Sequence, residues 1–449
     1  MSDFDVSGKR VTVAGAARSG IAASELLVRR GATVTLSDTR AAVNEAEPLR
    51  KLGVELELGG HRTETFNDAD LIVMSPGVPP GQPVIAEARR RGVPVIGELE
   101  LASRWLRGRM VAITGTKGKS TTTELTGRIL EAAGLRVTVG GNIGAPLSAQ
   151  VAGSTPESVH VVEASSFQLE QIETFHPWIA VMLNFSADHL DRHPTVEAYG
   201  AAKARVFENQ DASDWKVINA DDPAVLALAQ QGRAQTRLFS MHGAIAAGTA
   251  IEHDWIVDRS AAQTTKLVPL DTIHLLGPHL VNDVMAAATV GAIAGAAPAA
   301  MTAAVDAFHG LEHAMELVAE VGGVRFVNDS KATNVDAALH SIESFDSGLV
   351  AIIGGRFKGG DLRLLREPLR KRARAVVAIG EAAPLVKEAL SGAIDVRDAA
   401  TFEDAVKEAF ALAKPGGVVL LAPACASFDM FSDYAERGRR FKEEVGKLS

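Results

Sequence analysis

A glycine-rich loop between an apolar run and a helical pattern carries the clearest chemical signal in the chain. The segment reads VAITGTKGKSTTTEL, and its loop extends from Gly115 to Thr121. Glycines let backbone N–H groups converge on phosphate oxygens, and the N-terminus of the following helix adds partial positive charge. Lys119 adds a full positive charge, while Ser120 or Thr121 can offer a hydroxyl to Mg²⁺. Gly115 lies closer to Gly118 than in the common GxxxxGK[ST] loop, yet the strand–loop–helix context still predicts nucleotide phosphate binding.

A second glycine-rich turn, VAGAARSG at 13–20, also follows an apolar run. Ala17 stands where a dinucleotide fingerprint has its middle glycine, so the motif is weak. Asp38 ends the next apolar run, where an acidic group would meet a ribose hydroxyl in a NAD site. An oxidoreductase hypothesis would rest on this motif alone, and the lysine-bearing loop argues against it. A plain tight turn between strand and helix is the competing interpretation.

Bulk properties limit the classes of function. The chain has 449 residues, enough for about three domains, and a formal net charge of -9. This charge argues against a global basic field for nucleic acid or an anionic membrane. Cys425 is the only cysteine, which excludes an intramolecular disulfide, and we interpret it as a small buried residue. The start, MSDFDVSGKR, is polar and acidic without an apolar signal core, so we expect a cytoplasmic protein.

Short β-branched runs alternate with Ala/Leu-rich helical stretches along the whole chain, which is typical of parallel α/β domains. Three series of such runs begin near residues 11, 110 and 324. We therefore place domain boundaries near 98 and 310. Residues between about 240 and 276 are less regular, and we expect extra antiparallel strands there.

Seven segments, in order along the chain, together resemble the Mur ligases. They are GTKGKST (115–121), GNIG (141–144), EASSFQLE (163–170), NFSADHLDRH (184–193), AAKARVFEN (201–209), NDSKATN (328–334) and PACASFD (423–429). The resemblance implies an α/β protein of three domains. A Rossmann-like domain at 1–98 would bind a UDP-linked substrate, and a P-loop ATPase domain at 99–310 would bind ATP. A Rossmann-like domain at 311–449 would help hold ATP and the incoming amino acid.

The resemblance also implies the reaction. ATP phosphorylates the carboxylate of the UDP-linked substrate, and an amino group then attacks the acyl phosphate. Within the family, NDSKATN followed by GGRFKGGD and ACASFD favours D-glutamate as the amino acid and UDP-N-acetylmuramoyl-L-alanine as the acceptor, a step of peptidoglycan precursor synthesis. Such chemistry requires neutralisation of phosphate charge and exclusion of water. We expect these small molecules as partners, no nucleic acid or membrane, and a monomer.

By resemblance, five residues carry the catalysis and two Mg²⁺ sites. Lys119 would bind the β- and γ-phosphates, Ser120 and Glu163 would hold one Mg²⁺, and His189 would hold a second. Lys203 matches a lysine that the family carbamylates, which turns a cation into a metal-binding anion. Carbamylation requires a neutral amine, so we expect a partly buried Lys203 with a lowered pKa. The competing interpretations are a helix cap for Glu163, a surface histidine for His189, and an ordinary amphipathic helix around Lys203.

The remaining assignments by resemblance concern ligand contacts. The ATP contacts would be Gly115, Thr116, Lys117, Gly118, Lys119, Ser120 and Thr121 for phosphate, Asp283 for adenine, Asp329 for ribose, and Lys331. The uridine and diphosphate contacts would be Arg18, Ser19, Asp38, Thr39, Arg40, Ser75 and Gly77, and those to the sugar and alanyl part Asn142, Ser165 and Gln168. Thr333 would lie near the reacting groups, and Lys358, Ser427 and Phe428 would bind D-glutamate, with Tyr434 where an aromatic Phe is usual. A solvated lysine is the alternative for Lys358, because its turn is glycine-rich.

The chain departs from the family pattern at positions near the nucleotide. Leu280 and Asp283 replace two asparagines that usually flank adenine, and Ala314 replaces an arginine. These changes predict weak ATP affinity without a change of reaction class. They also motivate the alternative of a nucleotide-sugar sensor without catalysis. Within enzymes, the alternative is another amino-acid ligase of the superfamily. Retention of both predicted metal sites argues against the sensor.

Overall fold

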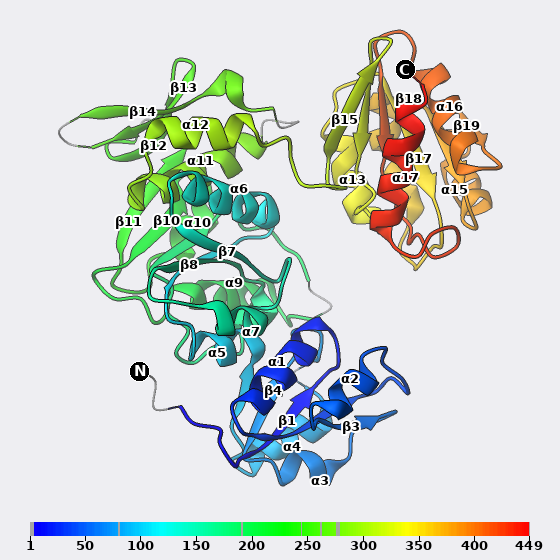
Figure 1. The fold of residues 1–449 in the computed structure, drawn as a ribbon. Coiled ribbons are helices and arrows are strands. Elements are labelled where there is room, and N and C mark those ends of the chain that lie inside the picture. Colours follow the sequence, from blue (N-terminus) through cyan, green and yellow to red (C-terminus); the bar gives the residue numbers. More distant parts are fainter. Residues whose placement is uncertain are drawn as a thin grey trace. The chain divides into compact units, whose positions relative to one another are not determined.

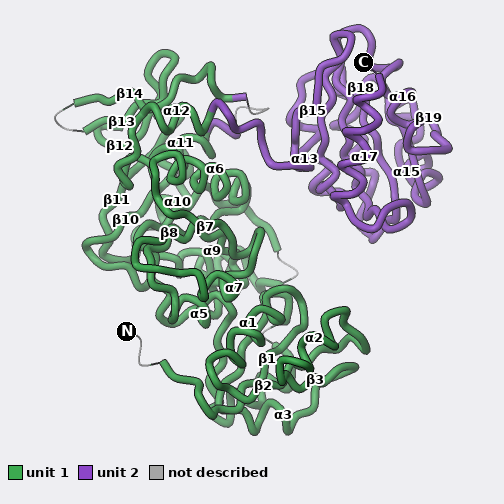
Figure 2. Tube along the Cα trace, viewed as in Figure 1, with its two compact units in different colours: residues 1–273, 282–305 green, residues 274–281, 306–449 purple. Residues whose placement is uncertain are grey.

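The computed structural model describes residues 4–79, 81–189, 192–243, 245–260, 263–274 and 279–448. Their strands form three separate sheets (Figure 1). The chain divides into two compact units, one of residues 1–273 and 282–305 and the other of residues 274–281 and 306–449 (Figure 2). Among the helices of the described residues, none is both long and apolar enough to cross a membrane.

The N-terminal sheet is wholly parallel, with the strand order β3-β2-β1-β4-β5. Its chain order reverses between β1 and β4, which creates a switch point where the following loops diverge. Gly15 and Gly20 make the first turn tight, because a Cβ on Gly20 would lie 1.8 Å from the Gly15 carbonyl oxygen. The elements are β1 (Arg10–Ala14), α1 (Arg18–Arg29), β2 (Thr33–Asp38), α2 (Ala46–Lys51), β3 (Glu55–Leu58), α3 (Thr63–Asn67), β4 (Leu71–Met74), α4 (Pro83–Arg90) and β5 (Val95–Gly97).

The central sheet has nine strands in the order β14-β13-β12-β11-β10-β9-β6-β8-β7. Its strands are β6 (Arg109–Thr114), β7 (Arg136–Gly141), β8 (Ser158–Glu163), β9 (Ile179–Met182), β10 (Trp215–Asn219), β11 (Gln235–Ser240), β12 (Gly248–Glu252), β13 (Trp255–Arg259) and β14 (Thr264–Pro269). The pairs β12–β13 and β13–β14 are antiparallel, which confirms the prediction for residues 240–276. The buried strand β6 is apolar on both faces, as expected when helices cover both sides of a parallel sheet.

The helices of this part are α5 (Glu98–Ser103), α6 (Lys119–Ala132), α7 (Leu147–Gln150), α8 (Ser166–Leu169), α9 (Val196–Ala204), α10 (Pro223–Leu228), α11 (His279–Ile293) and α12 (Pro298–Asp306). Short 3-10 helices lie at Val151–Gly153, Arg205–Phe207 and Leu270–Thr272. Helix α5 is fixed by Glu100, a buried carboxylate that accepts the backbone N–H groups of Glu173, Thr174 and Phe175.

The C-terminal sheet has the order β15-β16-β20-β17-β18-β19, and only its edge strand β15 is antiparallel to its neighbour. Its strands are β15 (Glu316–Val321), β16 (Val324–Asn328), β17 (Leu349–Gly354), β18 (Ala373–Ile379), β19 (Val396–Asp398) and β20 (Val418–Leu421). Its helices are α13 (Val335–Glu343), the 3-10 helix Leu362–Leu365, α14 (Arg366–Arg372), α15 (Ala383–Leu390), α16 (Phe402–Ala413) and α17 (Tyr434–Gly446). The domain boundaries near 98 and 310 stay a proposal; each falls between two of the three sheets.

Candidate active site

The phosphate loop joins β6 to α6, and a neighbouring strand holds it in shape. Gly118 has a φ of 79°, in the left-handed region that favours glycine, and α6 begins at the next residue, Lys119. Asn184, which follows β9, accepts the N–H groups of Thr116 and Lys117 at 3.1 and 2.8 Å. The Lys119 ammonium donates to the Thr116 carbonyl at 2.8 Å. The loop is therefore shaped by the protein itself, with its lysine folded over it.

Glu163 connects this loop to the next strand. It ends β8, which neighbours β6, and its side chain is buried. Its Oε2 accepts from the Ser120 hydroxyl at 2.7 Å, and its Oε1 accepts from the Asn142 amide at 2.7 Å. Carboxylate and hydroxyl oxygens are the ligands that Mg²⁺ prefers, so Ser120 and Glu163 fit a magnesium site.

Lys203 lies on α9 and is 1% exposed. Its Nζ donates to the Gly115 carbonyl at 2.6 Å and lies 4.6 Å from the centre of the Tyr199 ring. Burial, followed by the nearby charge of Lys119, lowers the pKa of Lys203 to about 7. A substantial share of this amine is neutral near pH 7, which is the form that reacts with CO₂.

His189 lies near Tyr199, the neighbour of Lys203, and its side chain is half exposed. Its Nε2 is 3.8 Å from an Asp188 oxygen, and its ring packs edge-on against Phe167 with centroids 5.0 Å apart. Residues 190 and 191 lie outside the described residues. Sequence reasoning missed His193, which is buried, donates to or accepts from the Ser166 hydroxyl at 2.9 Å, and lies 3.2 Å from Glu170. The sequence feature that could have indicated His193 is the second histidine of DHLDRH.

A cavity of about 180 Å³ lies where loops from the N-terminal and central sheets meet, both within the first compact unit. In its wall, the Arg18 guanidinium donates to the Gly144 carbonyl at 3.2 Å. Six predicted substrate residues line it: Arg18, Ser19, Ser75, Gly77, Asn142 and Gln168. Sequence reasoning missed the other lining residues, Ala17, Pro76, Gly141, Gly144 and Pro146, although the first three each adjoin a predicted residue.

Within the first compact unit, four predicted substrate residues, Asp38, Thr39, Arg40 and Ser165, do not line this cavity. Asp38 is buried and accepts from the Ala16 N–H at 2.6 Å and from Arg40 Nε at 3.0 Å. This bond to the Arg40 guanidinium holds the pKa of Asp38 well below its usual range. Thr39 is exposed beside them, while Ser165 caps α8 by accepting from the Gln168 N–H.

Asp283 lies on α11 against the phosphate loop. A Cβ on Gly118 would lie 2.1 Å from Asp283 Oδ1, so the two residues pack in direct contact. Burial raises the pKa of Asp283 well above its usual value, and the Thr122 hydroxyl and the Lys119 charge oppose this shift. Leu280 is partly buried, and residues 277 and 278 of the same stretch lie outside the described ones. A contact between Asp283 and adenine stays a prediction.

In the second unit, three adjacent parallel strands bring the remaining predicted residues to one edge of the sheet. The segment with Asp329, Lys331 and Thr333 follows β16, Lys358 follows β17, and Ser427 and Phe428 follow β20. Ligands of α/β proteins bind at this carboxyl edge. Ser427 is buried, whereas Phe428 and Tyr434 are 59% and 41% exposed, an uncommon position for large aromatic side chains.

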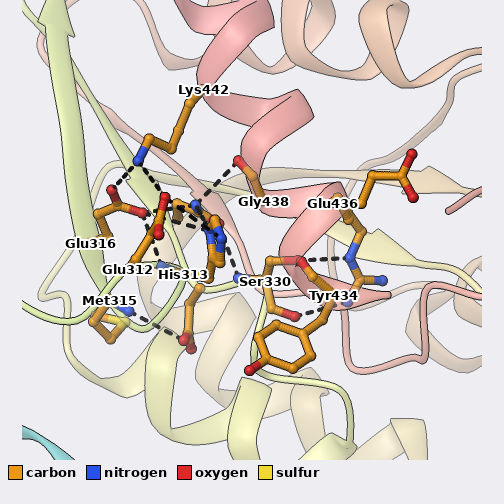
Figure 3. Close-up of polar contacts among 12 residues, drawn as sticks. Glu312, His313, Met315, Glu316, Ser330, Tyr434, Glu436, Gly438 and Lys442 are labelled. Carbon is orange, nitrogen blue, oxygen red and sulfur yellow. Dashed lines mark hydrogen bonds and ion pairs between the residues drawn. The ribbon is translucent and has the colours of Figure 1, made fainter. Parts of the chain in front are cut away.

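A polar network fixes α17 against this edge. Lys442 reaches Glu312 and Glu316 at 3.1 and 2.7 Å, and the Ser330 hydroxyl donates to the Tyr434 carbonyl at 2.7 Å (Figure 3). Asp329 is buried within the same region, accepting from the Ser341 hydroxyl and the Met315 N–H, and burial raises its pKa.

Arg437, which sequence reasoning missed, is the buried centre of the same edge. Its Nε donates to the Ser330 hydroxyl at 2.9 Å, and its Nη2 donates to the Ser330 carbonyl at 2.9 Å. Its Nη1 donates to the Cys425 carbonyl at 3.2 Å. One side chain therefore links the segments after β16 and β20. Cys425 is buried as predicted, and burial raises the pKa of its thiol to about 11.

Three largely parallel α/β sheets, a phosphate loop and a candidate substrate cavity fit a nucleotide-dependent ligase of the Mur type. Family models match in the same order: the Mur ligase MurD-like N-terminal domain at 9–97, the Mur ligase middle domain at 113–291, and the Mur ligase glutamate ligase domain at 313–425. The chain belongs to the Mur ligase family, as its motifs predicted.

Curated relatives match almost the whole length. UDP-N-acetylmuramoylalanine–D-glutamate ligase of Koribacter versatilis is 45% identical over 449 residues, with 99% of each chain covered. The protein of the same name from Acidobacterium capsulatum is 46% identical, covering 98% of this chain and 97% of its own. Among solved structures, UDP-N-acetylmuramate-alanine ligase from Thermotoga maritima is 18% identical with a TM-score of 0.59, covering 98% of this chain and 100% of its own. That likeness supports the fold.

Proposed function

We propose that the protein is an ATP-dependent ligase that joins D-glutamate to UDP-N-acetylmuramoyl-L-alanine in peptidoglycan precursor synthesis. Its relatives at 45% and 46% identity carry the name of this ligase. In this reaction a carboxylate oxygen of the acceptor attacks the γ-phosphorus of ATP and ADP leaves. The amino nitrogen of D-glutamate then attacks the acyl carbon and inorganic phosphate leaves, which forms the amide.

The position of Glu163 carries the proposal. One of its oxygens bonds to Ser120 of the phosphate loop, and the other bonds to Asn142, which lines the substrate cavity. A single buried carboxylate thus joins the site for the phosphoryl donor to the site for its acceptor. Lys119 and the N-terminus of α6 supply positive charge for the phosphates, since fixed donors and charges stabilise phosphoryl transfer without reorganisation.

Two Mg²⁺ sites and a carbamate belong to the proposal. Ser120 and Glu163 would hold one ion, and His189 with a carbamylated Lys203 would hold the second. Bound Mg²⁺ would neutralise phosphate charge during transfer. In carbamylation the neutral Lys203 amine adds to CO₂ and loses one proton, which leaves a carboxylate-like group. The burial and the pKa of about 7 of Lys203 support this step.

We further propose that the enzyme works in the cytoplasm as a monomer. Analytical ultracentrifugation of the purified protein tests the monomer, and a stable dimer would contradict it. The net charge of -9 supports small-molecule substrates rather than nucleic acid.

Phosphate release tests the function. Purified protein is incubated with ATP, Mg²⁺, UDP-N-acetylmuramoyl-L-alanine and one amino acid at a time from a panel. We expect release only with all components present, driven by D-glutamate. Equal release with L-alanine or L-glutamate would reject the specificity, and no release with any amino acid would favour the sensor hypothesis.

A further inference from the structure

A second, much smaller cavity adjoins the substrate cavity. Its volume is about 10 Å³, and it shares Ser75, Pro76 and Gln168 with the larger cavity. Its wall also contains Glu98, Phe167 and Arg192. A volume of this size holds about one water-sized sphere, so the cavity can take a single oxygen atom but no larger group.

Glu98, the first residue of α5, brings an unsatisfied carboxyl oxygen to this wall. The residue is 1% exposed, and its Oε1 accepts from the Ser148 N–H at 2.7 Å. Its Oε2 is buried and has no hydrogen-bond partner of good geometry among the residues that the structure describes, although the Ser148 hydroxyl lies near the same carboxyl group. Buried polar atoms nearly always have a partner, so this oxygen indicates a missing one.

Gln168 brings the complementary donor. The residue is 3% exposed, and its Oε1 accepts from both the N–H and the hydroxyl of Ser165, at 3.0 and 3.1 Å. The bond from the Ser165 N–H fixes the orientation of the amide, because a backbone N–H can only donate and so needs the amide oxygen. The Nε2 is thereby turned away from Ser165, and within the described chain this buried donor also has no partner.

We propose that this small cavity binds one hydroxyl oxygen, which accepts a hydrogen bond from Gln168 Nε2 and donates one to Glu98 Oε2. The oxygen belongs either to a buried water or to a hydroxyl group of the acceptor substrate. An anion is disfavoured by the carboxyl group of Glu98, and a metal ion by the guanidinium of Arg192 in the same wall. Glu98 becomes a positioning residue of the acceptor site, an assignment that rests on the proposed function.

The bound oxygen links two parts of the acceptor site. Glu98 follows the last strand of the N-terminal sheet, whereas Gln168 lies on α8 after a strand of the central sheet and also lines the substrate cavity. A partner on Nε2 holds the Gln168 amide in one orientation, and so fixes what it presents to the acceptor. Loss of that partner should weaken binding of the acceptor and leave ATP and D-glutamate unaffected.

Steady-state kinetics test the assignment with Glu98→Gln, which keeps the shape of the side chain. Its oxygen can still accept from Ser148, but its NH₂ group then meets the cavity, where Gln168 already donates. We expect the acceptor KM to rise about 5- to 50-fold, with kcat changed less than about twofold. The control is Glu100→Gln, two residues along α5, equally buried but bonded to Glu173, Thr174 and Phe175. It should lower Tm without raising the acceptor KM.

A crystal structure of the wild-type protein at high resolution, with and without the acceptor, decides the source of the oxygen. An ordered oxygen between Glu98 and Gln168 in both crystals supports a water, and its replacement by a substrate hydroxyl supports the second source. An empty cavity in both crystals, or an unchanged acceptor KM in Glu98→Gln, overturns the assignment. Failure of the wild type to release phosphate would reject the proposed function instead, and the crystals would still decide the oxygen site.

Discussion

The Lys203 ammonium donates to the carbonyl oxygen of Gly115, the first residue of the phosphate loop, at 2.6 Å. A helix residue far along the chain thereby touches the loop that is expected to bind ATP. Lysine is rarely so buried without an anionic partner, and here burial and Lys119 together lower its pKa to about 7. The position therefore suits a neutral amine better than a permanent cation.

The first prediction concerns Lys203→Ala. If a carbamate on this lysine is the functional group, the variant loses an anion that binds metal, and kcat should fall by about 10²–10³. A short carboxylic acid added to the assay should restore part of the activity, because it can occupy the vacated space. Phosphate release measured with and without added acetate or propionate checks both points.

Lys216→Met provides a matched control. Lys216 is also buried, and burial lowers its pKa, but it donates to the carbonyls of Ala229 and Gln231 at 2.8 and 3.0 Å, well away from the loop. Its loss should reduce Tm and leave kcat nearly unchanged, with no response to carboxylic acids. Wild-type activity in unrescued Lys203→Ala would reject the carbamate.

Comparison with the sequence shows what local patterns can and cannot predict. The phosphate loop was predicted because glycine, lysine and serine at fixed spacing between a strand and a helix have one common use, and the family assignment is confirmed. Arg437 was not predicted, because its partners Ser330 and Cys425 are distant in sequence. A helical pattern such as YAERGRRF reveals an amphipathic helix but not which arginine is buried.

Strand β3 shows the same limit for predicting which charged residues are buried. Its sequence, ELEL, alternates charged and apolar residues, and Glu57 was not a candidate for burial. Ser37, Thr65 and Arg62 all donate to its carboxylate, so the charge is satisfied inside the fold. The partners come from two segments, Ser37 on β2 and Arg62 with Thr65 at the start of α3. Only the second segment adjoins β3 in sequence, so a local window does not contain the full set of partners.

The second prediction concerns the pH dependence of stability. Burial raises the pKa of Asp283 well above its usual value, so the native state keeps a proton that the unfolded chain loses above about pH 4. The free energy of unfolding therefore falls as pH rises from about 4 towards the raised pKa. The Asp283→Asn substitution removes this titration and keeps the shape of the side chain. The Tm of the variant minus the Tm of the wild type should therefore increase with pH.

Thermal unfolding at pH 5 and pH 8 without nucleotide measures this difference. Asp254→Asn, in the exposed turn between β12 and β13, controls for the loss of one negative charge. A Tm difference for Asp283→Asn that is equal at both pH values would show that Asp283 is ionised in the native protein.

The double variant Leu280→Asn plus Asp283→Asn tests the adenine contact. Its ATP KM should be lower than that of the wild type if the two positions flank adenine.

The third prediction concerns Arg437→Met. The guanidinium makes three hydrogen bonds that join the segments after β16 and β20, and its loss leaves buried carbonyls of Ser330 and Cys425 without a donor. We expect a loss of about 2–4 kcal/mol in the free energy of unfolding, measured by urea denaturation. The D-glutamate KM should also rise, because Ser427 lies two residues after Cys425.

Arg440→Met is the matched control on the same helix. Arg440 is exposed and pairs with the exposed Glu443 and with Glu444. Glu444 is buried but keeps Lys447 as a second partner at 2.9 Å, so removal of Arg440 should cost about 1 kcal/mol or less. If the two variants are equally stable, the hydrogen bonds of Arg437 contribute nothing to the fold. If Arg437→Met is less stable but its D-glutamate KM is unchanged, the residue supports the sheet without shaping the amino-acid site.

The last prediction concerns Glu163→Gln, which keeps the length of the side chain and removes its charge. The native carboxylate accepts from Ser120 and from Asn142, each at 2.7 Å. A glutamine has one accepting oxygen, so it can keep one of these bonds and places an NH₂ group against the other donor. A neutral side chain also binds Mg²⁺ more weakly than a carboxylate does. We therefore expect the Mg²⁺ concentration at half-maximal activity to rise, and kcat at saturating Mg²⁺ to fall by about 10²–10³. Titration of Mg²⁺ at fixed ATP separates the two effects. If Mg²⁺ dependence is unchanged while kcat falls, Glu163 acts by positioning Ser120 and Asn142, and the first metal site must lie elsewhere.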